Sequence, residues 1–411
     1  MRSANFIHPK QLLPFADFML IMQPSLLTKT KMTPAPFASP ILITRPTLPP
    51  IERFEAHLKE VWFNRVLTNQ GSKHRQLENN LTTILGTRNV RLFNNGTLAL
   101  ILGLKALGIR GEVITTPFTF PATPHSLVWA GATPVFCDID PMSLCIDPNR
   151  IEALITPRTE AILGVHVYGI PCDVEAIQAI ANKYSLKVIY DAAHAFLTEI
   201  DDIPIASFGD MTMFSFHATK LFHTIEGGCL AFNNTELGEI LNLLKNFGIK
   251  DGEAVVMPGL NAKMNEIQCA MGIEMLKEAG VERERRKPLR KKYVELLSEI
   301  EGIDCIVLPD GVSDSLQYMA IRVDENKFGL SRDQLQEGLN NFNVFPRRYF
   351  FPLCTDYECY KEAVNDGVPA ARRAANQLLC LPFYGEIEIE AIARIAEMIA
   401  YLGKNKGDHF L

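Results

Sequence analysis

Residues 211–220 read MTMFSFHATK, in which a mostly apolar run, Met211 to Phe216, leads into a short segment that ends in Lys220. A second apolar run, Leu186 to Tyr190, is followed directly by Asp191. Short apolar runs of this kind are typical of strands buried in a parallel sheet. Ligands of such sheets bind beyond the carboxyl ends of the strands, so the lysine and the aspartate are expected to meet there.

A lysine and an aspartate in this arrangement suit pyridoxal phosphate chemistry. The amine can bond to the aldehyde of the cofactor, and the carboxylate can hold the pyridine nitrogen protonated, so that the ring accepts electrons. Taken alone, Asp191 could be a helix N-cap and Lys220 an exposed lysine. The hydroxyl of Ser215, near the end of the strand before Lys220, could bind the phosphate.

Apolar runs alternate with helical patterns over the first 260 residues. After two helices joined by a polar loop at 67–71, strands are expected at 90–93, 112–115, 133–137, 161–167, 186–190, 211–216 and 228–232. This alternation predicts an α/β fold with a mostly parallel, seven-stranded sheet between helices. Asn94, His166, Asp191 and Ser215 fall near strand ends and can therefore converge.

A different pattern follows residue 260. A long helical stretch at 263–300 is expected to break near Gly280 and Pro288. Beyond it, strands at 306–308 and 318–323 alternate with helices at 330–340 and 387–402. We therefore predict a large domain at 40–260, a helical connector at 261–300 and a small C-terminal α+β domain at 301–411. Residues 1–39 are expected to be a disordered extension, or part of them an upstream start before Met32.

The composition argues against several functions. The chain of 411 residues has a formal net charge of −6, and its densest basic run, Arg283 to Lys292, reads as a solvated helix face, so no nucleic acid partner is expected. The nine cysteines form no CxxC pair, which predicts reduced thiols, a cytoplasmic location and no metal site. The apolar stretch Leu12 to Met22 is short and interrupted, so no membrane span is expected.

Further residues could complete a cofactor site. Gly96 and Thr97 open a helix directly after a strand, where unpaired N–H groups and the helix dipole favour a phosphate, although an ordinary turn is the alternative. Phe120 follows another strand and could stack on a pyridine ring. Phe118 is the alternative, and both could be core residues. His194 could touch the cofactor, although a single histidine is more often structural.

Together, these residues lie in motifs that resemble the DegT/StrS-type nucleotide-sugar aminotransferases, members of the aspartate aminotransferase fold (fold type I). The resemblance runs from about Pro40 to Leu402. It is carried by NGTLAL at 95–100, TPFTF at 116–120, GATPVF at 131–136 with DID at 138–140, HVYG at 166–169, DAAH at 191–194, SFHATK at 215–220, EGG at 226–228 and GLNAKMNE at 259–266.

The resemblance implies a role for each cofactor residue. Lys220 and Asp191 match the two catalytic residues, which are the lysine bonded to pyridoxal phosphate and the partner of its ring nitrogen. The other matches are Phe120 for the stacking aromatic, Gly96, Thr97 and Ser215 for the phosphate cradle, and His194 for a residue near the ring hydroxyl. Asn261 corresponds to a residue that reaches the cofactor phosphate of the neighbouring subunit, which implies a homodimer with shared active sites.

His217 bears on the substrate. Family members that aminate carbon 4 of a keto sugar tend to carry histidine at this position, and the chain most resembles those that make a 4-amino-4,6-dideoxyhexose (viosamine type). The implied reaction transfers the amino group of glutamate to a nucleotide-linked 4-keto-6-deoxyhexose, for glycosylation of a polysaccharide, lipopolysaccharide or secondary metabolite. Leu221 and Ile225 depart from the pattern, since many members carry Asn or Pro, and Gly, at these positions.

Substrate contacts are expected at Thr68, Asn69, Arg347, Arg348 and Tyr349 by motif position. Two adjacent arginines suit a pyrophosphate, and surface charge is the alternative. A 3-keto-sugar aminotransferase would share every cofactor residue, and a catalytically idle regulatory member of the fold is the remaining alternative. A dehydratase of this fold replaces the lysine with histidine, so the lysine at position 220 argues against it.

Overall fold

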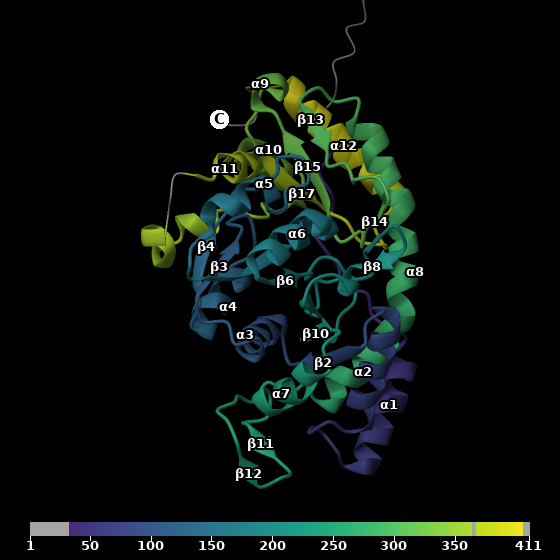
Figure 1. Ribbon diagram of the computed structural model, residues 1–411. Coiled ribbons are helices and arrows are strands. Elements are labelled where there is room, and N and C mark those ends of the chain that lie inside the picture. The colour runs from purple at the N-terminus through teal and green to yellow at the C-terminus, as the bar shows by residue number, and fades with distance from the viewer. Residues whose placement is uncertain (1–32, 364–366, 406–411) are drawn as a thin grey trace, which may run out of the picture. The chain divides into compact units, whose positions relative to one another are not determined.

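The computed structural model describes residues 33–363 and 367–405, and a seven-stranded sheet lies at its centre (Figure 1). Its strands are β2 (Asn89–Phe93), β10 (Gly228–Phe232), β9 (Met211–Ser215), β6 (Lys187–Asp191), β5 (Thr159–Val165), β3 (Glu112–Thr115) and β4 (Thr133–Phe136), in this spatial order. Strand β10 is antiparallel to both of its neighbours, and the other four pairings are parallel. The predicted sheet is therefore confirmed.

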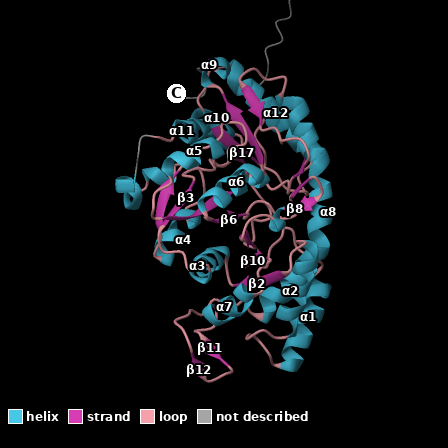
Figure 2. Ribbon diagram, in the orientation of Figure 1, coloured by secondary structure: helices cyan, strands magenta, loops and turns pink. Residues whose placement is uncertain are grey.

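Alternate residues of the strands fill two apolar clusters on opposite faces of the sheet. In β10, Leu230 belongs to the cluster under α3 (Gly96–Ala106), α4 (Ala122–Ala130) and α7 (Glu236–Leu244). Its neighbours Cys229 and Ala231 belong to the other cluster, with α2 (Ser72–Ile84) and α6 (Val174–Tyr184). Figure 2 shows the strands between these helices. Both faces are thus covered, as the apolar strands require.

The C-terminal part is built on a smaller sheet. Strands β13 (Ile303–Cys305), β15 (Met319–Val323) and β17 (Leu378–Leu381) pair antiparallel and pack with α10 (Arg332–Asn341) and α12 (Ile389–Lys404). Strand β1 (Ile41–Leu42) joins this region by pairing with β16 (Val344–Phe345). Residues 1–32 of the expected extension lie outside the described residues, whereas Phe37 is buried in this C-terminal cluster.

Two predictions for this region were wrong. The first strand is at 303–305 rather than 306–308, because Ile303 is the residue that pairs with Val323 and is buried. Helix α8 (Glu266–Leu297) is continuous, without a break at Gly280 or Pro288. Proline removes one backbone hydrogen bond, but α8 packs against α1 (Ile51–Asn64) and α2 near one end and against α12 near the other (Figure 1). Tertiary packing holds the helix together across the proline.

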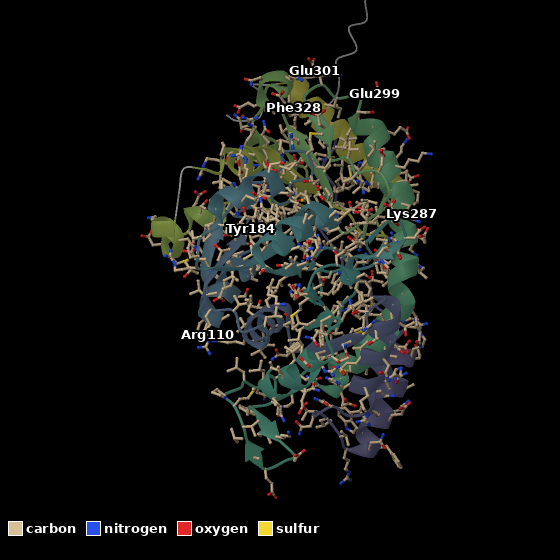
Figure 3. All side chains as sticks on the ribbon, in the orientation of Figure 1. Arg110, Tyr184, Lys287, Glu299, Glu301 and Phe328 are labelled. Carbon is tan, nitrogen blue, oxygen red and sulfur yellow. The ribbon has the colours of Figure 1, made fainter. Side chains whose placement is uncertain are left out.

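The basic run at 283–292 lies on α8. Lys287 projects at the outer edge of the helix (Figure 3) and pairs with Glu284 at 2.6 Å. Arg286, in contrast, is buried and pairs with Glu282 at 2.7 Å. The prediction of a solvated face therefore holds for Lys287 but not for Arg286.

Among the described helices, none is long and apolar enough to cross a membrane.

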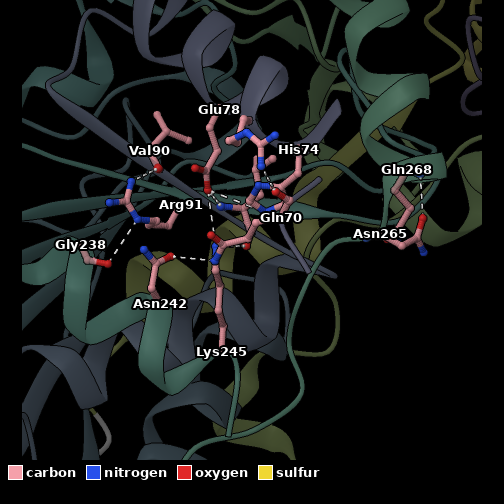
Figure 4. A network of polar contacts seen from close by, with 12 residues as sticks. Gln70, His74, Glu78, Val90, Arg91, Gly238, Asn242, Lys245, Asn265 and Gln268 are labelled. Atoms are coloured by element: carbon pink, nitrogen blue, oxygen red, sulfur yellow. Dashed lines mark hydrogen bonds and ion pairs between the residues drawn. The ribbon is translucent and has the colours of Figure 1, made fainter. Parts of the chain in front are cut away.

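A buried polar network links α2 to β2 and α7 (Figure 4). The Lys245 ammonium lies 3.4 Å from the Glu78 carboxylate and 3.3 Å from the carbonyl of Leu92. His74, one turn before Glu78 on α2, is also buried. Burial and the Lys245 charge lower the pKa of His74 to about 4. The histidine is therefore neutral in the folded protein at pH 7.

We expect His74 to make the fold sensitive to acid. The unfolded chain protonates this histidine near pH 6.5, but the folded protein does so only near pH 4. The unfolded state therefore binds more protons between these values, and stability falls as the pH is lowered through the window. The shift corresponds to about 3 kcal/mol. Denaturant unfolding at pH 7 and pH 4.5 should show a smaller loss for His74→Gln than for the wild type, and equal losses would contradict the assignment.

Candidate active site

A cavity of about 330 Å³ opens beyond the carboxyl ends of β2, β6 and β9. The sequence-predicted residues that line it are Gly96, Thr97, Phe120, Asp191, His194, Ser215, His217, Lys220 and Tyr349. Phe118, the alternative to Phe120, is fully buried and packs edge-on against other aromatic rings. The fold thus brings a lysine, a buried carboxylate and the start of a helix to one cavity.

Asp191 ends β6 and is only 5% exposed. Its Oδ2 accepts a hydrogen bond from the Thr123 hydroxyl at 2.8 Å, and its Oδ1 accepts one from the N–H of Ala193 at 3.0 Å. Burial nevertheless raises the pKa of Asp191, against the lowering effect of these bonds and of the Lys220 charge. A carboxylate in this position gains from a cationic partner within the cavity.

Lys220 lies in the loop after β9, with its Nζ 5.9 Å from the centre of the Tyr318 ring. Burial lowers the pKa of Lys220 to about 8, and the Asp191 charge only partly offsets it. A substantial fraction of the amine is therefore neutral near pH 8. A neutral amine is the form that attacks a carbonyl carbon and accepts a proton.

His194 is held in an aromatic stack. Its ring lies parallel to that of Phe350, with centroids 5.7 Å apart, and edge-on to Tyr318 at 4.9 Å. Its Nδ1 accepts the N–H of Tyr168 at 3.3 Å. Burial, assisted by the Lys220 charge, lowers the pKa of His194 well below its usual value. The ring is therefore neutral, and its proton lies on Nε2, which can donate to a ligand.

The start of α3 forms a cradle for an anion. Asn95 caps the helix by accepting the N–H of Leu98 at 2.8 Å, whereas the first N–H groups of a helix have no partner within it. A Cβ on Gly96 would meet Met213 Sδ at 2.9 Å and Ser215 Cβ at 3.3 Å. A Cβ on Gly228 would lie 2.6 Å from the backbone nitrogen of Gly96. Glycine at these two positions lets β9, β10 and the start of α3 approach closely, and the first N–H groups of α3 can bind a phosphate there.

A second cavity of about 270 Å³ shares Phe120, Tyr349 and Phe350 with the first and adds Arg347 and Arg348 to its lining. Arg348 pairs with Asp333 at 3.2 Å and lies over the Phe351 ring. The side chain of Arg347 is exposed and has no ion pair within the described part of the chain. Arg347 is thus the arginine whose charge is available to a ligand.

Three predicted residues do not line either cavity. Thr68 and Asn69 are exposed in the loop between α1 and α2, and Asn261 is exposed before α8. Sequence reasoning also missed residues that the fold brings in from far along the chain. Thr123 holds Asp191, and Tyr318 lies beside Lys220. Neither has a local pattern that distinguishes it from an ordinary core residue.

The fold and the site together define a pyridoxal-phosphate-dependent enzyme of fold type I. The cofactor fits these residues. Burial raises the pKa of Asp191, and a protonated pyridine nitrogen would supply the positive charge that stabilises its carboxylate. The glycine cradle at the start of α3 suits the cofactor's phosphate.

The chain belongs to the DegT/DnrJ/EryC1/StrS aminotransferase family, whose model matches residues 51–400. It is 47% identical over 365 residues to the dTDP-4-amino-4,6-dideoxy-D-glucose transaminase of Shigella dysenteriae. The matched region covers 88% of this chain and 98% of the relative.

Solved structures agree with this assignment. DesI, crystallised in the presence of its TDP-sugar product, superposes with a TM-score of 0.87 and 34% identity, over 91% of this chain and 95% of DesI. NtdA from Bacillus subtilis, solved with bound PMP cofactor, superposes with a TM-score of 0.78 and 29% identity, over 86% and 82% of the two chains. The predicted family, fold and cofactor are confirmed, and the protein is a pyridoxal-phosphate-dependent aminotransferase.

Proposed function

We propose that the enzyme transfers the amino group of glutamate to dTDP-linked 4-keto-6-deoxyglucose and so forms dTDP-4-amino-4,6-dideoxyglucose. The observation that carries the proposal is the placement of Lys220 and Asp191 in one cavity that shares lining residues with a second cavity, which is lined by arginines. The relative at 47% identity is named for this product, which supports carbon 4 over carbon 3. His217 at the cavity wall is in keeping with this choice.

Each residue has a distinct task in such a transfer. When bound, the cofactor supplies a ring that accepts electrons from the carbon that loses its proton. The Lys220 amine would take up that proton from the α carbon of glutamate and deliver it to the former aldehyde carbon of the cofactor, since burial lowers the pKa of Lys220 to about 8. The Asp191 carboxylate would stabilise the positive charge of the cofactor's ring nitrogen, and His194 would donate a hydrogen bond from Nε2 to the cofactor's ring oxygen. Loss of the keto acid and entry of the keto sugar imply ping-pong kinetics.

The two half-reactions test the proposal directly. Glutamate added to the purified holoenzyme should convert the absorbance band of the lysine-bound cofactor to that of the pyridoxamine form. The dTDP-linked 4-keto sugar should then restore the first band. Restoration by a 3-keto sugar alone would favour the carbon 3 alternative. A band that ignores glutamate would point to another amino donor, or to an idle member of the fold.

Arg347 is our candidate for the pyrophosphate of the sugar nucleotide. Its charge is unpaired within the described residues, and it lines the cavity next to that of Lys220. A hydrogen bond between charged groups contributes about 1.5–3 kcal/mol, so Arg347→Ala should raise the KM for the sugar nucleotide by about 10-fold or more. Arg348→Ala should have a smaller effect, because that side chain already pairs with Asp333. Equal KM values for wild type and Arg347→Ala would rule out this role.

We also propose a homodimer with shared active sites. Thr68, Asn69 and Asn261 are exposed and lie outside their own cavity, so they are available to a partner. Large apolar side chains are exposed near them, namely Trp62, Phe63, Val66, Leu67, Val255, Val256 and Leu260. They lie on α1, on β12 (Ala254–Val255) and in the adjoining loops, at the lower end of Figure 1. A second copy would cover them.

The cysteines bear on the location of the enzyme. All nine are free thiols, which supports a cytoplasmic location.

A further inference from the structure

The turn at 224–227 lies at the wall of the cofactor cavity, and its backbone is strained. Ile225 has a φ of 70°, a conformation that a β-branched residue rarely adopts. Its side chain is 46% exposed, so burial of this side chain does not account for the strained conformation. Backbone strain of this kind persists only where the surroundings fix it, and it clusters at functional sites.

Side chains from both sides hold the turn. The carbonyl of Glu226 accepts hydrogen bonds from Gln268 Nε2, in the first turn of α8, at 2.6 Å and from the Thr224 hydroxyl at 2.8 Å. The N–H of Ile225 donates to Nδ1 of His223 at 3.2 Å. These three bonds fix the backbone on either side of the strained residue. The turn therefore fixes the backbone position from which the Glu226 side chain extends.

That side chain meets His217. Glu226 Oε1 lies 3.6 Å from Nε2 of His217, and Nδ1 of the same ring lies 2.8 Å from the Thr219 hydroxyl. Both side chains line the cavity of Lys220, yet about half of each is exposed. On the inner wall, Asp191 and His194 are buried. A large polar substrate that enters the cavity therefore meets His217 and Glu226 at its open side.

We propose that Glu226 is a specificity-determining residue for the keto sugar, held at the open side of the cavity by the hydrogen-bonded turn at 224–227. An ionised carboxylate only accepts hydrogen bonds and offers two oxygens, which suits the hydroxyl groups of a hexose. A site built to bond a hydroxyl strongly disfavours an analogue that lacks it. The inference rests on the proposed keto-sugar transfer. It goes beyond that function by assigning sugar recognition to a residue outside the cofactor contacts.

Two variants of the holoenzyme test this role. Glu226→Gln keeps the shape of the side chain and removes its charge, and it should raise the KM for the keto sugar about 10-fold. The ratio of kcat/KM for that sugar to kcat/KM for an analogue that lacks one hydroxyl group should also fall. Ile225→Gly relieves the strain but keeps the three hydrogen bonds of the turn, so it should raise the Tm and leave the KM for the keto sugar nearly unchanged. The matched control is Glu301→Gln, because Glu301 is exposed at the upper end of the molecule (Figure 3) and does not line the cavity.

The two half-reactions separate the outcomes. In Glu226→Gln the rate of the keto-sugar half-reaction should fall more than that of the glutamate half-reaction, which a merely structural defect would not produce. Equal losses in both half-reactions, or an unchanged KM and sugar preference in Glu226→Gln, would overturn the role of Glu226 and leave the proposed function standing. A wild-type enzyme that reacts with glutamate but not with the keto sugar would instead overturn the proposed function, and the role of Glu226 with it.

Discussion

Replacing Lys220 by alanine is expected to lower turnover by at least about 10²–10⁴-fold, the usual contribution of a positioned proton-transfer group. The loss should exceed this range, because the variant also lacks the amine that bonds to the cofactor. No other lysine lines the cavity within the described residues, so none is placed to take over. The absorbance band of the lysine-bound cofactor should disappear together with the activity.

Steady-state turnover with glutamate and the keto sugar, measured beside the absorbance spectrum, checks this expectation. Lys105→Ala is a suitable control, since Lys105 is an exposed residue of α3 that does not line the cavity. The control should retain both the band and the activity. Turnover within tenfold of the wild type in Lys220→Ala would sink the assignment of this lysine.

The sequence could predict the part of the fold that is written in local patterns. Strands β6 and β9 are largely buried, so each reads as a mostly apolar run, and the residues at their ends were predicted to meet. Some motifs can be recognised from the sequence alone, and they include Gly96, Gly228 and Lys220. The carboxyl-end rule then predicted that most of these candidate residues meet, and they do line one cavity.

What could not be predicted depends on contacts between distant segments. Pro288 reads locally as a helix breaker, and only the packing of α8 against three other helices keeps the helix continuous. Thr123 and Asp191 are 68 residues apart, and no local pattern announces their hydrogen bond. The turn that contains Ile225, with its positive φ, is bonded to Gln268 of α8, which is 42 residues from Glu226. Tertiary contacts decide each of these features.

Replacing Asp191 by asparagine is expected to lower turnover by about 10²–10³-fold, the usual cost of removing a preorganised electrostatic partner. The carboxylate accepts hydrogen bonds from Thr123 and Ala193 while it offers negative charge to the cavity. A neutral amide cannot hold the ring nitrogen protonated. Its NH₂ group would also face one of those two donors, so a buried hydrogen bond would be lost.

The comparison with Thr123→Val separates charge from geometry. The Thr123 hydrogen bond lowers the pKa of Asp191 against the effect of burial, so its loss should raise that pKa further. The carboxylate of this variant is then protonated at a higher pH than in the wild type. Activity should therefore fall at the acidic end of the pH profile and recover as the pH rises. Asp191→Asn has no carboxylate to ionise, so its activity should stay low at every pH. Recovery of the asparagine variant at high pH would show that the charge of Asp191 is not what the cofactor requires.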